Sequence, residues 1–485
     1  MRGRRPGGGI EGFFIIHYRV GAINAGNIKQ ELKGNMAQAD TLAIILAAGM
    51  GTRMKSESPK VMHRLAGRSM LGHVLAAVDE AGIEQCMAVI GPDMAGVEAE
   101  LDNWPRPAAH VVQAERLGTA HAVLQARERL MGPAPDRVLV LYGDTPLLTP
   151  HTLRRMAEGL THADCVVLGF EAEDPEGYGR LLLSEDGALL AIREHADATD
   201  EEKSVTLCNS GVMAFRGAHI LDLLEAVGNE NAKGEYYLTD AIEIAHARGL
   251  RTIVETAPED EVLGINSRMQ LSEAEYVLQN RLRLKAMEAG ATLIDPDSVF
   301  FCHDTVLGRD VTVEPNVVFG PGVRIGDGVQ IKAFSHLEGA DVEDGAVLGP
   351  FARLRPGAHI GAGAKVGNFV EIKKSEIESG AKVNHLTYIG DAVVGAGANI
   401  GAGTITCNYD GFNKYQTRIG AGAFIGSNSA LVAPVSIGDG AYVGSGSVIT
   451  RDVEADALAV GRGRQMSKAG WAAAFRARSG RKQAG

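Results

Sequence analysis

A large apolar residue recurs at every sixth position through most of the second half of the chain. The series contains Leu307, Val313, Phe319, Ile325, Ile331 and Leu337 and, after a five-residue step, Val342, Leu348, Leu354, Ile360, Val366 and Ile372. A period of six fits neither an α-helix, with 3.6 residues per turn, nor a β-strand, with two. It fits a parallel β-helix, in which each hexapeptide forms one side of a triangular coil.

Glycine commonly follows the apolar residue, as in Ile325-Gly326 and Ile360-Gly361. Glycine permits a tight corner because it has no Cβ. The alternative, a glycine-rich flexible tail, would not keep the apolar residues in phase as far as Ile449. The repeat is interrupted after Thr406 by CNYDGFNKYQTR, which we interpret as a loop extending from the coil.

The first half of the chain follows a different pattern. Short apolar runs at 42–46, 87–90, 138–142 and 165–169 alternate with helical patterns at 71–81 and 119–130. This alternation predicts a Rossmann-like α/β domain with a mostly parallel sheet. Residues 267–289 have apolar residues at helical spacing and no glycine or proline, which predicts a connecting helix of roughly 33 Å at 1.5 Å per residue.

We therefore expect four segments: an extension at 1–40, predicted to be disordered, an α/β domain at 41–266, a linker helix at 267–290, and a β-helix with a C-terminal tail at 291–485. The start, MRGRRPGGGI, is basic and precedes a short apolar patch. Polar residues interrupt that patch too early for a signal peptide. An upstream start codon, with Met36 opening the functional chain, is the alternative to a disordered extension.

Composition limits the partners that the chain can have. A net charge of −12 argues against a general role with nucleic acid or anionic membranes and leaves small anionic substrates open. No run of 18 apolar residues exists, so we expect no membrane span. Scattered cysteines without a C-x-x-C motif favour a reducing compartment, here the cytoplasm. They are Cys86, Cys165, Cys208, Cys302 and Cys407.

The stretch LAAGMGTRMKSESPK, residues 46–60, is the strongest motif of the first half. It lacks the third glycine of a dinucleotide-binding turn, because Met54 stands there, and it is not a Walker loop. Gly49 and Gly51 can let backbone N–H groups approach phosphate oxygens. Arg53 and Lys60 supply the positive charge that a triphosphate needs. A structural turn with incidental charges is the alternative.

This stretch resembles the signature of sugar nucleotidyltransferases, and further matches follow along the chain. They are Gln113 and Gly118-Thr119 in QAERLGTAHA, Tyr142-Gly143-Asp144, Gly179 in GYGR, Glu194 in REH, Asn209 in NSG and Asn266 in GINSR. Together with the repeats, residues 40–472 resemble the bifunctional bacterial family of N-acetylglucosamine-1-phosphate uridylyltransferases and glucosamine-1-phosphate N-acetyltransferases. The resemblance implies a left-handed β-helix and the production of UDP-N-acetylglucosamine.

The resemblance also implies a first site, in which Arg53 and Lys60 stabilise charge and Asp144 and Asn266 hold Mg²⁺. Carboxylate and amide oxygens suit that ion. The residues implied to bind UTP or UDP-N-acetylglucosamine are Leu46, Ala47, Ala48, Gly49, Lys60, Gln113, Gly118, Thr119, Tyr142, Gly143, Asp144, Gly179, Glu194, Asn209 and Asn266.

A second site is implied on the β-helix, with His385 as the general base that accepts a proton from the glucosamine amine. The implied sugar-phosphate ligands are Arg355, Lys373, Tyr388 and Asn399. The implied acetyl-CoA ligands are Ala402, Asn408, Tyr409, Ser427, Ser445 and Arg462. The expected partners are glucosamine-1-phosphate, N-acetylglucosamine-1-phosphate, UTP and acetyl-CoA, and the resemblance implies a homotrimer.

Three other interpretations are open from the residues alone. In the first, a nucleotidyltransferase carries a β-helix that is only regulatory, which would not require polar residues around His385. In the second, histidines of the β-helix hold zinc, but His303, His336, His359 and His385 lack the spacing of β-helix carbonic anhydrases. In the third, the β-helix is a scaffold or ice-binding surface, which would require periodic threonines that the sequence does not have.

Overall fold

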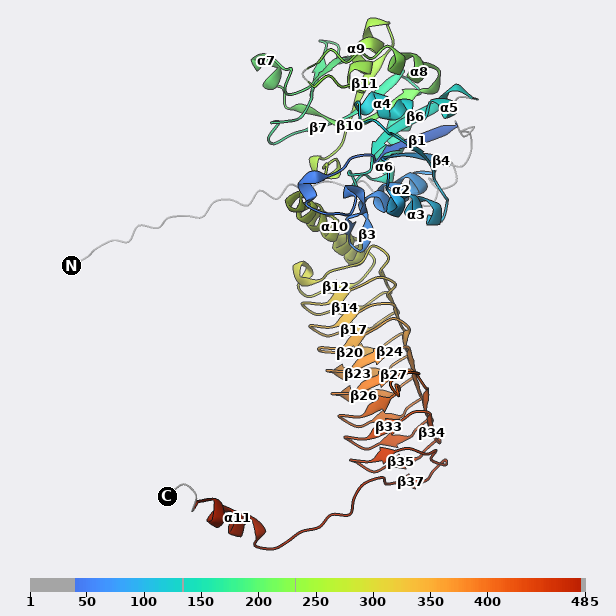
Figure 1. The fold of residues 1–485 in the computed structure, drawn as a ribbon, viewed down its shortest axis with the longest axis vertical. Helices are drawn as coiled ribbons and strands as arrows, with labels where there is room; N and C mark the ends of the chain where they lie inside the picture. The colour runs from blue at the N-terminus through green and yellow to red at the C-terminus, as the bar shows by residue number, and fades with distance from the viewer. Residues whose placement is uncertain (1–39, 133–134, 232, 481–485) are drawn as a thin grey trace, which may run out of the picture.

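The computed structural model describes residues 40–132, 135–231 and 233–480. The extension predicted before residue 40 lies outside these ranges. The described chain forms an α/β unit, a long helix and a stack of coils, in that order along the molecule (Figure 1). The predicted fold class, an α/β nucleotidyltransferase fold followed by a left-handed parallel β-helix, is confirmed.

The centre of the α/β unit is a sheet whose longest path has the strand order β11-β7-β10-β6-β1-β4-β5. Four of the pairings along it are parallel, and β10 is antiparallel to both of its neighbours. The strands are β1 Thr41–Leu46, β4 Gln85–Ile90, β5 Ala109–Val112, β6 Arg137–Tyr142, β7 Cys165–Glu171, β10 Leu207–Arg216 and β11 Thr252–Thr256, with β8 Arg180–Leu183 and β9 Leu189–Arg193 pairing beside β10.

Apolar side chains on both faces of this sheet are buried, since helices cover both. The helices are α2 Met70–Ala81, α3 Ala95–Asn103, α4 Thr119–Leu124, α5 Arg127–Met131, α6 Pro150–Gly159, α7 Asp200–Lys203, α8 Gly217–Glu225 and α9 Asp240–Ala247. The single helix predicted over 119–130 is wrong, because the chain divides there into α4 and α5. Gln125 N–H bonds to the Ala122 carbonyl three residues back, and its side chain bonds to the His121 carbonyl.

Helix α10, Arg268–Glu288, connects the two folds and packs against both. Its first half contributes Leu271, Ala274 and Leu278 to a small core with the α/β unit. Its second half places Leu282 and Met287 against the β-helix core. Ser267 caps the helix by accepting a hydrogen bond from Gln270 N–H.

The β-helix consists of three parallel sheets whose strands stack coil upon coil. The first sheet contains β12 Thr292–Leu293, β14 Thr312–Val313, β17 Gln330–Ile331, β20 Val347–Leu348, β23 Lys365–Asn368, β26 Lys382–His385, β29 Asn399–Ile400, β32 Phe424–Ile425, β35 Tyr442–Val443 and β37 Leu458–Ala459. The second contains β13 Val306–Leu307, β16 Arg324–Ile325, β19 Ala340–Val342, β22 Ala358–Ile360, β25 Ser375–Ile377, β28 Ala392–Val394, β31 Thr417–Ile419 and β34 Val435–Ile437. The third contains β15 Val318–Phe319, β18 His336–Leu337, β21 Arg353–Leu354, β24 Glu371–Lys373, β27 Tyr388–Gly390, β30 Ile405–Cys407, β33 Ala430–Val432 and β36 Val448–Ile449.

The sixth-position residues of the sequence repeat fill the interior of this prism, as predicted. Ile331, Leu348, Val366, Val383 and Ile400 lie above one another on the first sheet, and each is 2% exposed or less. Burying a stack of such side chains is the main source of stability in a fold where each coil contacts only its neighbours.

The corner between the first and third sheets is formed by a column of residues with left-handed backbone conformation. We call this set the corner column: Asn316, Phe334, Phe351, Phe369, Leu386, Gly403, Asn428 and Gly446. Its members occupy successive coils, and each coil bonds to the one before it through the backbone near this corner. The members from Phe334 to Leu386 are bulky and apolar, whereas Asn316 above them and the members after Leu386 are asparagine or glycine.

After the last coil the chain ends in α11, Trp471–Gly480, which lies apart from the prism (Figure 1). The 3-10 turns of the chain are η1 Thr52–Met54, η2 Lys60–Met62, η3 Glu259–Glu261 and η4 Pro296–Ser298, and β2 Arg64–Leu65 pairs with β3 Arg68–Ser69. Within the described residues, every helix is too short or too polar to cross a membrane.

Candidate active sites

A cavity of about 310 Å³ opens where β1 and β6 end, which is where open α/β sheets bind ligands. It brings together most of the residues that the nucleotidyltransferase motifs predicted. Its lining contains Leu46, Ala47, Ala48, Gly49, Lys60, Val61, Gln113, Arg116, Gly118, Thr119, Ala122, Tyr142, Asp144 and Glu235.

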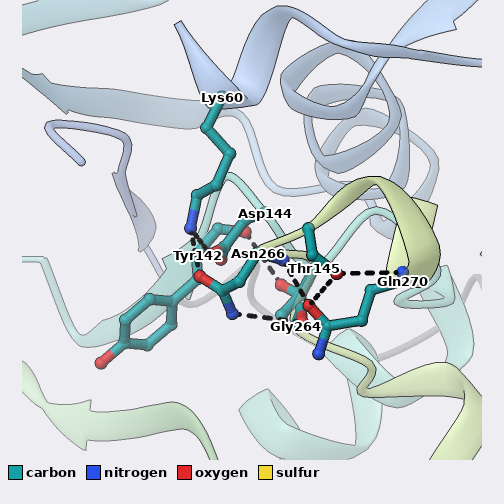
Figure 2. Close-up of polar contacts among 8 residues, drawn as sticks. Lys60, Tyr142, Asp144, Thr145, Gly264, Asn266 and Gln270 are labelled. Atoms are coloured by element: carbon teal, nitrogen blue, oxygen red, sulfur yellow. Dashed lines mark hydrogen bonds and ion pairs between the residues drawn. The ribbon is translucent and has the colours of Figure 1, made fainter. Parts of the chain in front are cut away.

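The Lys60 side chain joins two distant parts of the chain in this cavity. Its ammonium bonds to a carboxylate oxygen of Asp144, at the end of β6, and to the Asn266 side-chain oxygen at 2.8 Å, just before α10 (Figure 2). The Lys60 and Asp144 side chains are only 11% and 17% exposed. Two oxygens that share one ammonium group are close enough to share a metal cation.

The loop that carries Asn266 is fixed to the end of β6. Ile265 N–H donates to the Asp144 carbonyl at 2.9 Å, and Asn266 N–H donates to the Gln270 side chain at 2.8 Å (Figure 2). The Asn266 amide group also donates to the Gly264 carbonyl at 3.3 Å, which leaves its oxygen turned to Lys60. A carboxylate and an amide oxygen held in this way fit Mg²⁺, which favours a few protein oxygens and keeps several waters.

Arg116 is a residue of this cavity that the sequence analysis did not single out. Its Nε donates to the Ala48 carbonyl at 2.8 Å, so the guanidinium lies against the loop that contains Gly49. The signal was available, because Arg116 stands inside the quoted stretch QAERLGTAHA. Glu235 also lines the cavity and was missed; it belongs to no motif that we recognised.

Three of the residues implied to bind UTP or UDP-N-acetylglucosamine, Gly179, Glu194 and Asn209, lie outside the lining of the cavity. Burial, followed by the nearby carboxylates of Asp144 and Glu194, raises the pKa of Tyr142, and its hydroxyl bonds to Thr119. Burial also raises the pKa of Glu194, whose carboxylate accepts from the Thr239 hydroxyl at 3.3 Å. Asn209, on β10, donates its N–H to the carbonyl of Gly179 at 2.8 Å. Gly179 directly precedes β8 and Glu194 directly follows β9.

Two predicted residues take other positions. Arg53 is exposed on η1 and lies outside the cavity lining. Gly143 is also outside the lining, but its N–H donates to the Leu46 carbonyl at 3.0 Å, and a Cβ there would meet Val61 at 3.1 Å. Gly143 therefore permits the close approach of β1, β6 and η2 that forms the cavity wall.

On the β-helix, His385 lies at the end of β26, immediately before the corner residue Leu386. Its Nδ1 lies 2.7 Å from the side-chain oxygen of Asn368, its register partner in the preceding coil. Because an amide oxygen only accepts, Nδ1 carries the proton and Nε2 keeps a free lone pair. The histidine is exposed, and this orientation suits a base. Asn368 was not predicted.

Across the corner, the third sheet carries a group of cations. Arg355 donates to Glu371 at 2.7 Å. The neighbouring ammonium of Lys414, followed by desolvation and then by Arg355, lowers the pKa of Lys373. Lys414, from the loop after Thr406, was missed because it falls outside the repeat. Cations held this close together, with Tyr388 beside Glu371 in the register of β24 and β27, are suited to a phosphate dianion.

The predicted acetyl-CoA residues lie lower on the prism. Ala402, Ser427 and Ser445 each precede a member of the corner column, and Arg462 donates to the Ser445 carbonyl. Asn399, which was predicted to bind the sugar phosphate, faces outward on β29 of the first sheet. The other two predicted acetyl-CoA residues, Asn408 and Tyr409, belong to the loop after Thr406. Asn408 is buried and donates to Asp391 at 2.5 Å, whereas Tyr409 is 60% exposed.

His385 does not belong to a group of metal-ligand types within the described chain. There, the one group of three ligand types within reach of a single ion is Cys302, His303 and Asp304, at the top of the β-helix. His385 lies many coils away from it, beside Asn368. The five cysteines are all free.

Comparison with known proteins covers both folds. The family described as "MobA-like NTP transferase domain" matches residues 43–236, and the one described as "Bacterial transferase hexapeptide (six repeats)" matches 304–339 and 416–451. A "Bifunctional protein GlmU" from Azorhizobium caulinodans is 62% identical over 92% of this chain and 99% of the relative. Proteins of that name from Xanthobacter autotrophicus and Paramagnetospirillum magneticum are 60% and 56% identical, over 91% and 93% of this chain and 98% and 99% of the relatives.

These relatives match the chain across both folds, and their identity far exceeds what a shared fold alone would give. The cavity in the α/β unit and the polar corner of the β-helix provide two separate places for chemistry, as a bifunctional protein requires. The chain belongs to the family of bifunctional N-acetylglucosamine-1-phosphate uridylyltransferases and glucosamine-1-phosphate N-acetyltransferases.

Proposed function

We propose that this enzyme of UDP-N-acetylglucosamine synthesis performs its two reactions in the two places described above. Acetyl transfer to glucosamine-1-phosphate takes place beside His385, within 291–485. Uridylyl transfer to N-acetylglucosamine-1-phosphate takes place around Lys60, within 41–266, and 267–290 connects the two units. The observation that carries this division is that the candidate residues form two separate polar clusters, one in each fold.

Uridylyl transfer needs no protein nucleophile. An oxygen of the sugar phosphate attacks the α-phosphorus of UTP, and the bond from that phosphorus to the bridging oxygen of pyrophosphate breaks. The protein aligns the two phosphates and stabilises negative charge. Lys60 and Arg116 direct positive charge into the cavity, and Gly49 gives the phosphates access to backbone N–H groups. We keep Arg53 as a catalytic proposal that requires its loop to close on the ligand.

Asp144 and Asn266 would hold Mg²⁺ through the two oxygens that Lys60 now bridges. When bound, the ion supplies charge neutralisation for the triphosphate. The chain's own contribution is to fix both ligands. The bond from Ile265 N–H to the Asp144 carbonyl connects the Asn266 loop directly to the strand that carries Asp144.

In acetyl transfer, the amine nitrogen of glucosamine-1-phosphate attacks the thioester carbon of acetyl-CoA, and the carbon–sulfur bond breaks to release CoA. His385 Nε2 takes the proton that the nitrogen loses. Arg355, Lys373 and Lys414 would hold the phosphate, because they gather on the third sheet, across the corner from His385. This cluster favours a catalytic β-helix over a purely regulatory one.

We propose that the enzyme is a homotrimer whose acetyltransferase site is completed by a neighbouring copy. Support comes from the aromatic ridge, which we define as Phe334, Phe351 and Phe369 of the corner column. The three rings stack at 5.0 and 4.9 Å and are 54%, 44% and 54% exposed. Each also has a left-handed backbone, which is costly for a bulky residue. A second copy covering the ridge accounts for both features. We place the trimer in the cytoplasm, where UTP and acetyl-CoA are made.

One assay tests the proposed function. The intact enzyme is incubated with glucosamine-1-phosphate, acetyl-CoA, UTP and Mg²⁺, and the expected products are UDP-N-acetylglucosamine, CoA and pyrophosphate. Without acetyl-CoA, the nucleotide sugar should form only when N-acetylglucosamine-1-phosphate is added. Consumption of UTP without any release of CoA would indicate that the β-helix is only regulatory.

A further inference from the structure

We propose that Leu386 limits the length of the acyl group that the enzyme transfers. Its side chain would block the upper end of the surface along which the acyl-CoA donor lies. The inference rests on the proposed acetyltransferase function. It concerns the boundary between the bulky and the small members of the corner column, which falls directly beside His385.

Below Leu386, the corner column provides a path for an extended ligand. Gly403, Asn428 and Gly446 follow one another in successive coils, and each comes directly after a proposed acetyl-CoA residue. Asn428 N–H donates to the Ala402 carbonyl and Gly446 N–H to the Ser427 carbonyl, both at 2.7 Å. These bonds stack the three corners above one another. A donor that contacts all three must therefore lie along the axis of the β-helix.

Leu386 is the first bulky side chain that this donor would meet on its way up the column. Gly403 N–H donates to the His385 carbonyl at 3.2 Å, so Leu386 occupies the corner one coil above Gly403. Its side chain is 62% exposed, and its φ is +50°. The thioester carbon must lie near His385 for the amine to attack it, so the end of the acyl group lies against the neighbouring Leu386.

The backbone at this position makes leucine an unfavourable residue. Left-handed conformation is unfavourable for a side chain with a Cβ, and the same column uses glycine in the next coil. Phe334, Phe351 and Phe369 share the exposure and the left-handed backbone of Leu386, but Leu386 alone directly follows His385 in the chain. Its place beside the proposed base, rather than its backbone, therefore points to a role in the reaction. Phe369, one coil higher, is the next obstacle. Removal of the Leu386 side chain would thus extend the path by one coil, about 4.8 Å.

The test compares acyl donors of increasing length. The kcat/KM values for acetyl-, propionyl- and butyryl-CoA are measured by release of CoA, with glucosamine-1-phosphate as acceptor, for the wild type and Leu386→Gly. The acyl carbon leaves sulfur for nitrogen in every case, so only the group beside Leu386 changes. A pocket discriminates one methylene by about tenfold or more. We therefore expect Leu386→Gly to raise the butyryl-to-acetyl ratio at least tenfold.

A matched control is Asp310→Gly, which removes an exposed, left-handed side chain at the corner between the second and first sheets, several coils away from His385, and should leave the ratio unchanged. Leu386→Asn is a second variant, since asparagine tolerates this backbone and occupies the column at Asn428. If either Leu386 variant transfers acetyl groups with an unchanged ratio, the inference is overturned. A wild type that releases no CoA from acetyl-CoA would instead refute the proposed function.

Discussion

The bond between His385 and Asn368 decides which nitrogen of the imidazole that we propose as the base can act. Asn368 accepts the Nδ1 proton at 2.7 Å and lies in register with His385 on the adjacent coil. Its oxygen therefore fixes both the tautomer and the direction of the ring. Asn368 is a positioning residue, because it acts on the reaction only through His385.

Replacement of Asn368 should change acetyl transfer in two distinguishable ways. Asn368→Ala frees the ring, and misplacement of a catalytic group can cost up to about a hundredfold in kcat. Asn368→Asp places a carboxylate beside the ring, which stabilises the imidazolium, so activity should be lost at a higher pH than in the wild type. The pH dependence of kcat/KM for acetyl transfer measures both effects. Identical profiles for the wild type and Asn368→Asp would show that Asn368 has no influence on His385.

A second histidine, His73 on α2, gives a prediction for stability. Burial lowers its pKa to about 4 from an ordinary 6.5, and its Nε2 lies 2.8 Å from the Leu65 carbonyl. Because the folded-state pKa is the lower one, the unfolded chain binds more protons between these values. The resulting stabilisation, up to roughly 3 kcal/mol, is complete above pH 6.5 and is lost as the pH falls toward 4.

His73→Gln keeps a donor for the Leu65 carbonyl but cannot titrate. Its Tm should therefore fall less than that of the wild type between pH 7 and pH 4.5, as measured by thermal unfolding at a series of pH values. Comparison of the two proteins removes the contributions of groups that they share. Equal losses of Tm would contradict the assignment of a neutral, buried His73.

At the scale of elements, the sequence predicts the structure best where residues of one type repeat in the same surroundings. The interior of the β-helix could be read from residues such as Ile331 and Leu348, because every sixth side chain points inward. The antiparallel placement of β10 and the break between α4 and α5 could not, since both depend on tertiary contacts. Similarly, Asp144 stands in a recognisable motif, whereas Lys414 acquires neighbours only when its loop folds beside Lys373.

Helix α10 belongs to both folds, and this matters for separating them. Leu271 and Leu278 pack on the α/β unit, whereas Leu282 and Met287 pack on the β-helix. The first coil adds further contacts, including a bond from His303 N–H to the Ala66 carbonyl at 2.9 Å. The α/β unit thus has its own core, but part of its surface packs against α10 and the first coil of the β-helix.

A fragment of residues 36–290 should convert UTP and N-acetylglucosamine-1-phosphate to UDP-N-acetylglucosamine, and it should acetylate nothing. It should also melt at a lower temperature than the same unit in the whole enzyme, because the second half of α10 loses its partner. Activity assays and thermal unfolding of the fragment and the intact chain measure this. A folded fragment without uridylyl transfer would contradict the proposed division of functions.

At the scale of the whole molecule, the two proposed sites lie far apart. The cavity around Lys60 belongs to the α/β unit at one end, and β26, which carries His385, lies in the middle of the coils (Figure 1). The acetylated sugar phosphate must therefore leave one site to reach the other. The aromatic ridge runs along the prism toward His385, which is why assembly and acetyl transfer should depend on each other.

Phe351→Asp places a charge in the middle of the aromatic ridge. We expect this variant to sediment as a smaller species than the wild type and to lose acetyl transfer while uridylyl transfer continues. Phe475→Asp, on the exposed helix α11, is the matched control and should change neither property. A Phe351→Asp protein with the oligomeric state and acetyl transfer of the wild type would remove the aromatic ridge from the interface.

The claim that one chain runs two reactions at two sites is tested most directly by assaying two single variants, Asp144→Ala and His385→Ala, for both half-reactions. Asp144→Ala should acetylate normally and accumulate N-acetylglucosamine-1-phosphate, because it lacks a ligand for the metal in uridylyl transfer. His385→Ala should lose a factor of about 10²–10⁴ in acetyl transfer but should convert added N-acetylglucosamine-1-phosphate at the normal rate. A mixture of the two variants should then make UDP-N-acetylglucosamine from glucosamine-1-phosphate. Loss of both half-reactions in either variant, or normal acetyl transfer by His385→Ala, would contradict the account.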